Sequence, residues 1–106
     1  MPAHQAPLQG VLGSRDLEAR EGGERVKVAG LGVVHQAPPT ARGRHFITLE
    51  DEDGLINVIV RPKVYQRYRR VLREAPPLVI EGTVQHKDGS INVLARRAAA
   101  LPRRPG

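Results

Sequence analysis

The sequence predicts a small all-β barrel with one interposed helix, and three observations support this prediction. The chain has 106 residues, which is about the length of one domain. Apolar residues recur with a period of two in five short segments, as they do in half-buried strands. In residues 62–73 they instead recur with the spacing of a helix that packs one face against a core.

Composition places the chain among globular proteins. Hydrophobic residues make up 40% of it and charged residues 26%, which suffices for a modest core. The absence of cysteine excludes disulfides and thiolate zinc ligands. Apolar runs are far shorter than the roughly 20 residues of a membrane-spanning helix, and no signal-peptide pattern is found. We therefore expect a cytoplasmic protein without a membrane partner.

The charge balance favours a polyanionic partner. Lys and Arg number 17 against 11 Asp and Glu, the formal net charge is +6, and most of the cations are arginine. Cations gather in residues 61–73 and 96–104, whereas residues 50–53 are all acidic. A charged stretch by itself is usually a solvated surface, so the charge indicates a partner only in combination with the fold.

Four segments are predicted along the chain: a flexible N-terminal arm at residues 1–13, a short helix and linker at 14–24, the main domain at 25–101 and a basic tail at 102–106. The arm is inferred from its prolines and glycines and from its lack of an apolar period. Ser14 is expected to cap the short helix, with Asp16 in the first turn, and Gly22 and Gly23 are expected to end it.

Five strands are predicted, at residues 26–34, 45–51, 55–61, 78–86 and 90–96. The first is long, and Gly30 and Gly32 mark the place where it should bend or bulge. Asp53 and Gly54 are a strong signal for a tight hairpin between the second and third strands. A second tight turn is expected at residues 87–89, between the last two strands.

A helix is predicted between the third and fourth strands. Pro62 suits its first turn, and the helix must end before Pro76 and Pro77. Its apolar stripe consists of Val64, Tyr68, Val71 and Leu72. Five strands with a helix after the third are typical of the OB-fold, a five-stranded Greek-key barrel that binds oligonucleotides or oligosaccharides. An SH3-like barrel is the alternative, and the interposed helix argues against it.

The outer face of the second and third strands is the candidate binding surface. Alternation directs their larger apolar residues into the barrel: Ile47, Leu49, Ile56, Val58 and Val60. It leaves Phe46, Asn57 and Arg61 on the outer face, which OB-folds use for ligands. Phe46, the only phenylalanine, is expected to stack on a base. The alternative is a ring that only covers the edge of the barrel.

Three further cations lie on loops that flank this face in an OB-fold. Arg42 and Arg44 belong to the loop before the second strand, and Lys87 belongs to the loop between the last two strands. We expect them to contact phosphates, and arginine suits single strands because it also stacks on bases. Charge that serves only solubility is the alternative for each residue taken alone.

No catalytic, metal or cofactor site is predicted. The acidic residues 50–53 would point to alternate faces of a strand and end in a turn, which disfavours a metal site. The four histidines lack the spacing of metal ligands, and no phosphate-binding glycine motif is present. We therefore expect a protein that is not an enzyme.

Three motifs resemble those of one bacterial family: VAGL at residues 28–31, P-x-T-A-x-G at 38–43 followed by FITLED at 46–51, and NVIV at 57–60. Over about residues 10–101 the chain is similar to the C-terminal OB domain of error-prone DNA polymerases of the polymerase III alpha-subunit type. The resemblance implies binding of single-stranded template DNA during translesion synthesis. His35 stands where the polymerase pattern commonly has arginine, and it joins the candidate nucleic-acid-binding residues.

A second resemblance concerns the frame F-x-x-L-x-D-x-x-G-x-x-x-V, which begins at Phe46. It is similar to the anticodon-binding OB domains of aspartyl-type tRNA synthetases. This resemblance implies that Phe46 stacks on a base and that Asn57 hydrogen-bonds to one. Those synthetases usually have arginine at the position of Glu50 and glutamine at that of Asn57, so their anticodon specificity does not transfer.

The leading hypothesis is a non-catalytic binder of single-stranded nucleic acid, DNA above all. Polymerisation is not expected, because the catalytic domains of a polymerase need far more residues than one domain holds. One alternative is a protein-interaction module whose basic helix docks on an acidic partner in a translesion or replication complex. A separately encoded polymerase part and the remnant of a truncated polymerase gene are also open, as is the choice between DNA and RNA.

Overall fold

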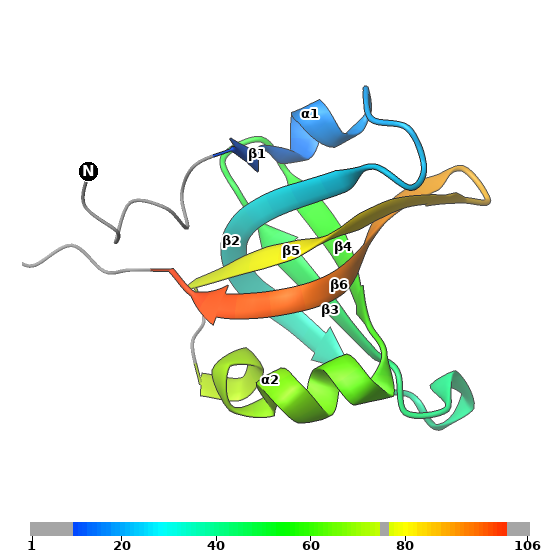
Figure 1. Cartoon of the computed structure of the whole chain (residues 1–106), viewed down its shortest axis with the longest axis vertical. Helices are drawn as coiled ribbons and strands as arrows, with labels where there is room; N and C mark the ends of the chain where they lie inside the picture. The colour runs from blue at the N-terminus through cyan, green and yellow to red at the C-terminus, as the bar shows by residue number, and fades with distance from the viewer. Residues whose placement is uncertain (1–9, 75–76, 102–106) are drawn as a thin grey trace, which may run out of the picture.

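The computed structural model describes residues 10–74 and 77–101 and shows a closed β-barrel with a helix at each end (Figure 1). Its elements are β1 (Val11–Leu12), α1 (Ser14–Leu17), β2 (Arg25–Gln36), the 3-10 helix η2 (Pro39–Ala41), β3 (His45–Glu50), β4 (Leu55–Val60), α2 (Pro62–Glu74), β5 (Pro77–Lys87) and β6 (Ser90–Ala100). The five strands β2 to β6, with α2 between β4 and β5, confirm the predicted OB-fold order.

Strand β2 closes the barrel because it pairs with two different strands. Its first half is antiparallel to β5 and its second half is antiparallel to β3. The change of partner occurs at Gly30, where a Cβ atom would lie 2.6 Å from the backbone oxygen of Glu50. The parallel pairing of β4 with β6 completes the order β1-β2-β3-β4-β6-β5, which returns to β2 through β5. The bend predicted at the glycines therefore lies where β2 leaves β5 and pairs with β3, and Gly30 permits the close approach of the two backbones there.

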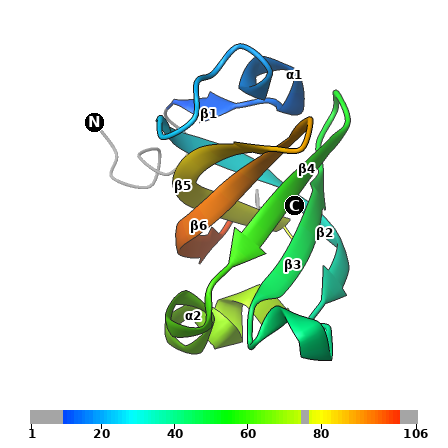
Figure 2. The same ribbon diagram turned by 90° about the vertical axis from the view of Figure 1, so that its right-hand side faces the viewer.

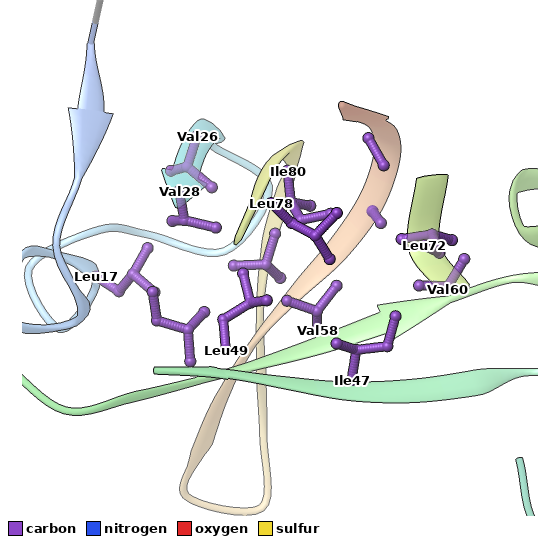
Figure 3. Close-up of a cluster of buried hydrophobic side chains, with 14 of the residues drawn as sticks. Leu17, Val26, Val28, Ile47, Leu49, Val58, Val60, Leu72, Leu78 and Ile80 are labelled. Atoms are coloured by element: carbon purple, nitrogen blue, oxygen red, sulfur yellow. The ribbon is translucent and has the colours of Figure 1, made fainter. Parts of the chain in front are cut away.

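The barrel interior is filled by aliphatic side chains. The five residues that alternation directed inward are all at most 3% exposed, which confirms the assignment of faces: Ile47, Leu49, Ile56, Val58 and Val60. Leu17 of α1 and Leu72 of α2 belong to the same cluster and close its two ends (Figure 3). Burial of each such side chain contributes about 1.5–3 kcal/mol, so this cluster dominates the stability of a small barrel.

Helix α2 has the predicted start and covers one end of the barrel. Leu72 is buried, while Val64, Tyr68 and Val71 are half-buried against the core. Tyr65 packs beside them, although the predicted stripe did not include it. Within residues 10–74 and 77–101, no helix has the length and apolar character needed to cross a membrane.

The N-terminal region differs from the prediction in its details. Ser14 is the first residue of α1 and not its cap; the cap is Gly13, whose N–H donates to the Asp16 carboxylate at 2.9 Å. The helix ends at Leu17, well before the glycines that were expected to end it. Ser14 does not cap the helix because its hydroxyl and its N–H both donate to Asp51 of the β3–β4 turn.

Two further differences concern strand length. Val11 and Leu12 form β1 and pair in parallel with β2, where the sequence predicted only an arm. Strand β6 extends to Ala100 because β5 continues to pair with it, up to the pair of Leu78 with Ala100. The remaining parts of the predicted arm, residues 1–9, and the predicted tail, residues 102–106, lie outside the described residues.

Candidate nucleic-acid interface

A groove of about 600 Å³ crosses the outer surface of β3, β4, β6 and β5. Figure 2 shows β3, β4 and β6 side by side on this side of the barrel, with α2 below them. We call it the strand groove. Its floor consists of side chains that alternate with the buried core residues on the same strands, so the packing of the core fixes their direction.

A row of polar side chains crosses the strand groove. Thr48 of β3 is paired with Asn57 of β4, Asn57 is paired with Asn92 of β6, and Asn92 is paired with Gln85 of β5. All four line the groove, and Asn57 is exposed. Each of the three amides offers both hydrogen-bond donors and an acceptor, as the edges of nucleobases do. We call these four residues the polar row.

A second row lies two residues away from the polar row on each strand and is mainly apolar. Phe46 of β3 is paired with Ile59 of β4, and Ile59 is paired with Leu94 of β6. The three side chains are half-buried and line the groove together. An aromatic ring between aliphatic neighbours offers a flat surface on which a base can stack. We call these three residues the apolar row.

Cations stand at both ends of the strand groove. Arg44 precedes β3 and Arg61 follows β4, so both lie beyond the apolar row. Arg44 is held in place by its Nε, which donates to the backbone oxygen of Ala41 at 3.1 Å. Lys87, at the end of β5, lies beyond the polar row. A polyanion that follows the groove therefore meets positive charge where it enters and where it leaves.

The structure brings five of the seven predicted site residues into this groove: Arg44, Phe46, Asn57, Arg61 and Lys87. Arg42 lies next to it, in a neighbouring depression that Arg44 and Arg61 also line. Its backbone is left-handed, with φ of 55°, because the chain turns sharply after η2. His35 does not line the strand groove, so the structure separates it from the other six.

His35 instead belongs to a ring cluster at the end of the barrel that α2 covers. Its Nε2 lies 2.8 Å from Nδ1 of His45, and the His45 ring stacks on Tyr65 with centroids 3.4 Å apart. Burial lowers the pKa of His35, and the positive charge of Arg73 lowers it further. Burial also lowers the pKa of His45, as does the neighbouring His35. Their spacing of ten residues gave no sign of this contact.

The acidic turn between β3 and β4 stabilises the fold through hydrogen bonds to Asp51. The Asp51 carboxylate accepts hydrogen bonds from the N–H and hydroxyl of Ser14 at 2.7 and 2.9 Å, and from the N–H groups of Asp53 and Gly54 at 2.9 Å each. Burial alone would raise the pKa of Asp51, but these hydrogen bonds outweigh it and hold the pKa below its usual value. Asp51 thus joins α1 to the hairpin. Among the described residues, no three histidine or acidic side chains are arranged to hold a metal ion.

The sequence prediction missed most of the polar row. Thr48, Gln85 and Asn92 all alternate with buried residues on their strands, which is the signal that could have found them. Alternation alone does not show that Asn92 lies beside Asn57, because that contact depends on a parallel pairing between strands that are distant in sequence.

Residues 26–99 match the family model described as the OB-fold nucleic acid binding domain. The chain belongs to this family. The matched region runs from the start of β2 almost to the end of β6, so it contains the whole barrel and the strand groove of this OB domain.

The OB domain is also similar to segments of bacterial polymerases. It is 44% identical over 92 residues to the error-prone DNA polymerase of Mycobacterium tuberculosis, which covers 87% of this chain and 8% of the polymerase. It is 44% identical over 101 residues to the error-prone DNA polymerase of Anaeromyxobacter dehalogenans, covering 91% of this chain and 9% of the polymerase. The chain thus spans less than a tenth of the length of these relatives.

A solved structure with the same fold is asparaginyl-tRNA synthetase from Pyrococcus horikoshii complexed with asparaginyl-adenylate. The match has a TM-score of 0.71 and 14% sequence identity, and it covers 85% of this chain and 22% of the synthetase. At this level of identity the likeness shows the fold alone.

Proposed function

We propose that this OB domain binds single-stranded nucleic acid, DNA above all, in the strand groove and without catalysis. The observation that carries the proposal is the arrangement of two rows, one for stacking and one for hydrogen bonding, between cations at both ends of one groove. Similarity to a segment of error-prone DNA polymerases supports DNA as the ligand.

Each part of the groove has a separate task in this proposal. Phe46 stacks on one base, which typically contributes about 1–3 kcal/mol and tolerates any sequence. The amides of Asn57, Asn92 and Gln85 hydrogen-bond to base edges and add a modest sequence preference. Arg44, Arg61 and Lys87 neutralise phosphates, so affinity falls as salt rises. His35 and Arg42 remain proposed contacts of lower rank, because neither lines the groove.

In its biological setting we propose that the domain holds template DNA during translesion synthesis. Its relatives are bacterial error-prone DNA polymerases, so we place it in the cytoplasm together with other replication or repair proteins. The chain corresponds to less than a tenth of those polymerases, so we do not propose that it carries out nucleotide addition.

Fluorescence anisotropy tests the proposal with labelled single-stranded DNA, single-stranded RNA and duplex DNA of about 16 nucleotides, the upper end of OB-fold site sizes. Phe46→Ala should weaken single-strand binding by roughly 5- to 150-fold, which corresponds to the loss of one stacked base. Val33→Ala is the matched control, since Val33 is 48% exposed on β2 and lies outside the groove. Unchanged affinity in Phe46→Ala, or preference for duplex, would contradict the proposal.

A second candidate function is docking on an acidic partner protein. Arg69 and Arg70 are exposed on α2 and line neither the strand groove nor the depression beside it. Under this candidate, a partner in a translesion or replication complex stays bound after nuclease treatment and is released by Arg69→Ala/Arg70→Ala. Complete loss of partners on nuclease treatment would argue against it.

A further inference from the structure

A second basic groove, of about 430 Å³, lies between α2 and the strands β5 and β6. We call it the helix groove. Five cations line it together with a single acid, Glu81: Arg25, Lys63, Arg67, Arg96 and Arg97. None of these five belongs to the strand groove, and the sequence prediction named none of them as a site residue.

A β-bulge turns two consecutive arginines toward this groove. The register between β5 and β6 shifts from the pair Glu81 and Arg97 to the pair Gly82 and Ala95, so Arg96 is the extra residue. In an unbroken strand one of two neighbouring residues would face the core, yet Arg96 and Arg97 are both exposed. Gly82 makes the close strand approach possible, because a Cβ atom there would overlap the carbonyl oxygen of Leu94.

The cations of the helix groove are not neutralised within the domain. Among the described residues, the side chains of Lys63, Arg96 and Arg97 have no hydrogen bond or ion pair. The Arg67 guanidinium lies 5.8 Å from the centre of the Tyr68 ring, which leaves its N–H donors available. Like charges that converge in one groove repel each other, and a bound polyanion removes that repulsion.

The helix groove and the strand groove both share lining residues with a third depression. The depression beside the start of α2 is lined by Arg42, Arg44, Arg61, Pro62, Lys63 and Val64. It shares Arg44 and Arg61 with the strand groove, and it shares Lys63 and Val64 with the helix groove. Strand β6 follows the same course, since Leu94 lies in the strand groove and Arg96 in the helix groove. Figure 1 shows α2 following β4 at the end of the barrel.

We propose that the helix groove binds the phosphodiester backbone of the same single strand after it leaves the strand groove past Arg44 and Arg61. This site rests on the proposed function and extends it: the bases are bound on the strands, and the following phosphates are bound beside α2. The helix groove is lined mainly by cations, and its one ring, the half-buried Tyr68, lies beside the Arg67 guanidinium, so we expect phosphate contacts that depend little on sequence.

The length of the oligonucleotide tests this path. Affinities are measured for oligothymidylates of about 4, 8, 12 and 16 nucleotides, which span the site sizes of OB-folds. Arg96→Ala/Arg97→Ala removes two cations of the helix groove, and Lys63→Gln/Arg67→Gln removes two from its other wall. Arg69→Ala/Arg70→Ala is the control with the same change in charge on the exposed side of α2. Thermal unfolding of each variant confirms that it is folded.

The proposal expects the two helix-groove variants to bind the shortest oligonucleotide like the wild type and the longest about fivefold more weakly, with a salt slope reduced by about 0.7 for each lost phosphate contact. An equal loss in the control variant, or no loss at any length, would overturn it. Binding of polyglutamate in the helix groove without any effect of length on oligonucleotide affinity would also overturn it. Failure of the wild type to bind these oligonucleotides at any length would overturn the proposed function itself.

Discussion

The two ends of the barrel carry opposite charge, and they differ in how far their charged side chains are paired within the domain. At one end, α1 meets the acidic β3–β4 turn, and its carboxylates accept hydrogen bonds from inside the chain: Asp51 from Ser14, Asp53 and Gly54, Asp16 from Gly13, and Glu24 from Glu21. At the other end, α2 and the loop before β3 present arginines and lysine. The one ion pair on α2 among the described residues joins Arg70 to Glu74 at 3.5 Å, and both side chains are exposed.

This difference separates charges that hold the fold from charges that are available to a ligand. A carboxylate with several local donors has its hydrogen-bonding capacity satisfied, so its removal should weaken the domain. An exposed cation without an internal partner contributes little to stability, so its removal should weaken binding instead. The Asp51 and Arg61 variants below test that separation directly, and the Gly82 and histidine variants test the packing and the titrating groups around it; the largest expected effect comes first.

Gly82→Ala should lower the free energy of unfolding by about 1–3 kcal/mol, the usual cost of forcing extra atoms into a packed site. The added methyl group would overlap the Leu94 carbonyl oxygen and displace the bulge that exposes Arg96 and Arg97. Chemical denaturation measures the loss. Gly22→Ala is the matched control, because a Cβ atom there would meet its nearest neighbour at an ordinary 3.8 Å. Equal stability of the two variants would show that the bulge does not depend on Gly82.

Asp51→Asn should lower the free energy of unfolding by about 1–2 kcal/mol and leave affinity for single strands unchanged, because it weakens the hydrogen bonds that join α1 to the β3–β4 turn and does not touch the groove. Glu52→Gln, which removes the neighbouring exposed charge, is the control. The pKa of Asp51 is lowered on folding, so its stabilising effect is present above the unfolded pKa near 3.8 and is lost as pH falls through the lower folded pKa. Acid denaturation should therefore be less steep in Asp51→Asn.

Arg61→Ala should weaken single-strand binding by roughly three- to fivefold and reduce the salt slope by about 0.7, as expected for one lost phosphate contact. Its free energy of unfolding should stay within about 0.5 kcal/mol of the wild type, since Arg61 is exposed and its side chain has no partner among the described residues. Arg15→Ala removes the same charge from the α1 end and serves as the control. Equal losses of affinity would mean that net charge, and not position, determines binding.

The His35 and His45 pair should make stability depend weakly on pH. Folding lowers the pKa of both rings, so the unfolded state takes up protons first as pH falls through about 6.5, and the domain loses stability in that window. We expect the free energy of unfolding to be lower at about pH 5.5 than at about pH 7.5. Denaturation at both pH values measures it. In His35→Gln/His45→Gln this dependence should disappear, and its persistence would assign it to other groups.

Local pattern predicted the parts of the fold that depend on neighbouring residues. The period of two in β3 and β4 separated core from surface correctly, because each strand has one buried face. Pro62 marked the start of α2, since proline suits the first turn of a helix. The five groove residues that the sequence named all lie on or beside these two strands or the β5–β6 turn.

Contacts between distant segments could not be read from such patterns. Asn92 joins Asn57 only through the parallel pairing of β4 with β6, and Ser14 reaches Asp51 only after the barrel has closed. The resemblance to the polymerases put His35 among the candidate binding residues, and the pairing of β2 with β3 sets it opposite the buried Ile47, on the side that faces α2. These positions depend on register between strands, which a single sequence does not display.

Nuclear magnetic resonance titration with unlabelled single-stranded DNA tests the central assignment most directly, because it reports on every backbone amide of the domain at once. Shifts should concentrate on the apolar row, the polar row and the cations at the ends of the strand groove, with α1 and the acidic turn unaffected. Shifts that centre on α1 and the β3–β4 turn, or that leave Phe46 and Asn57 unchanged, would contradict the assignment of the strand groove.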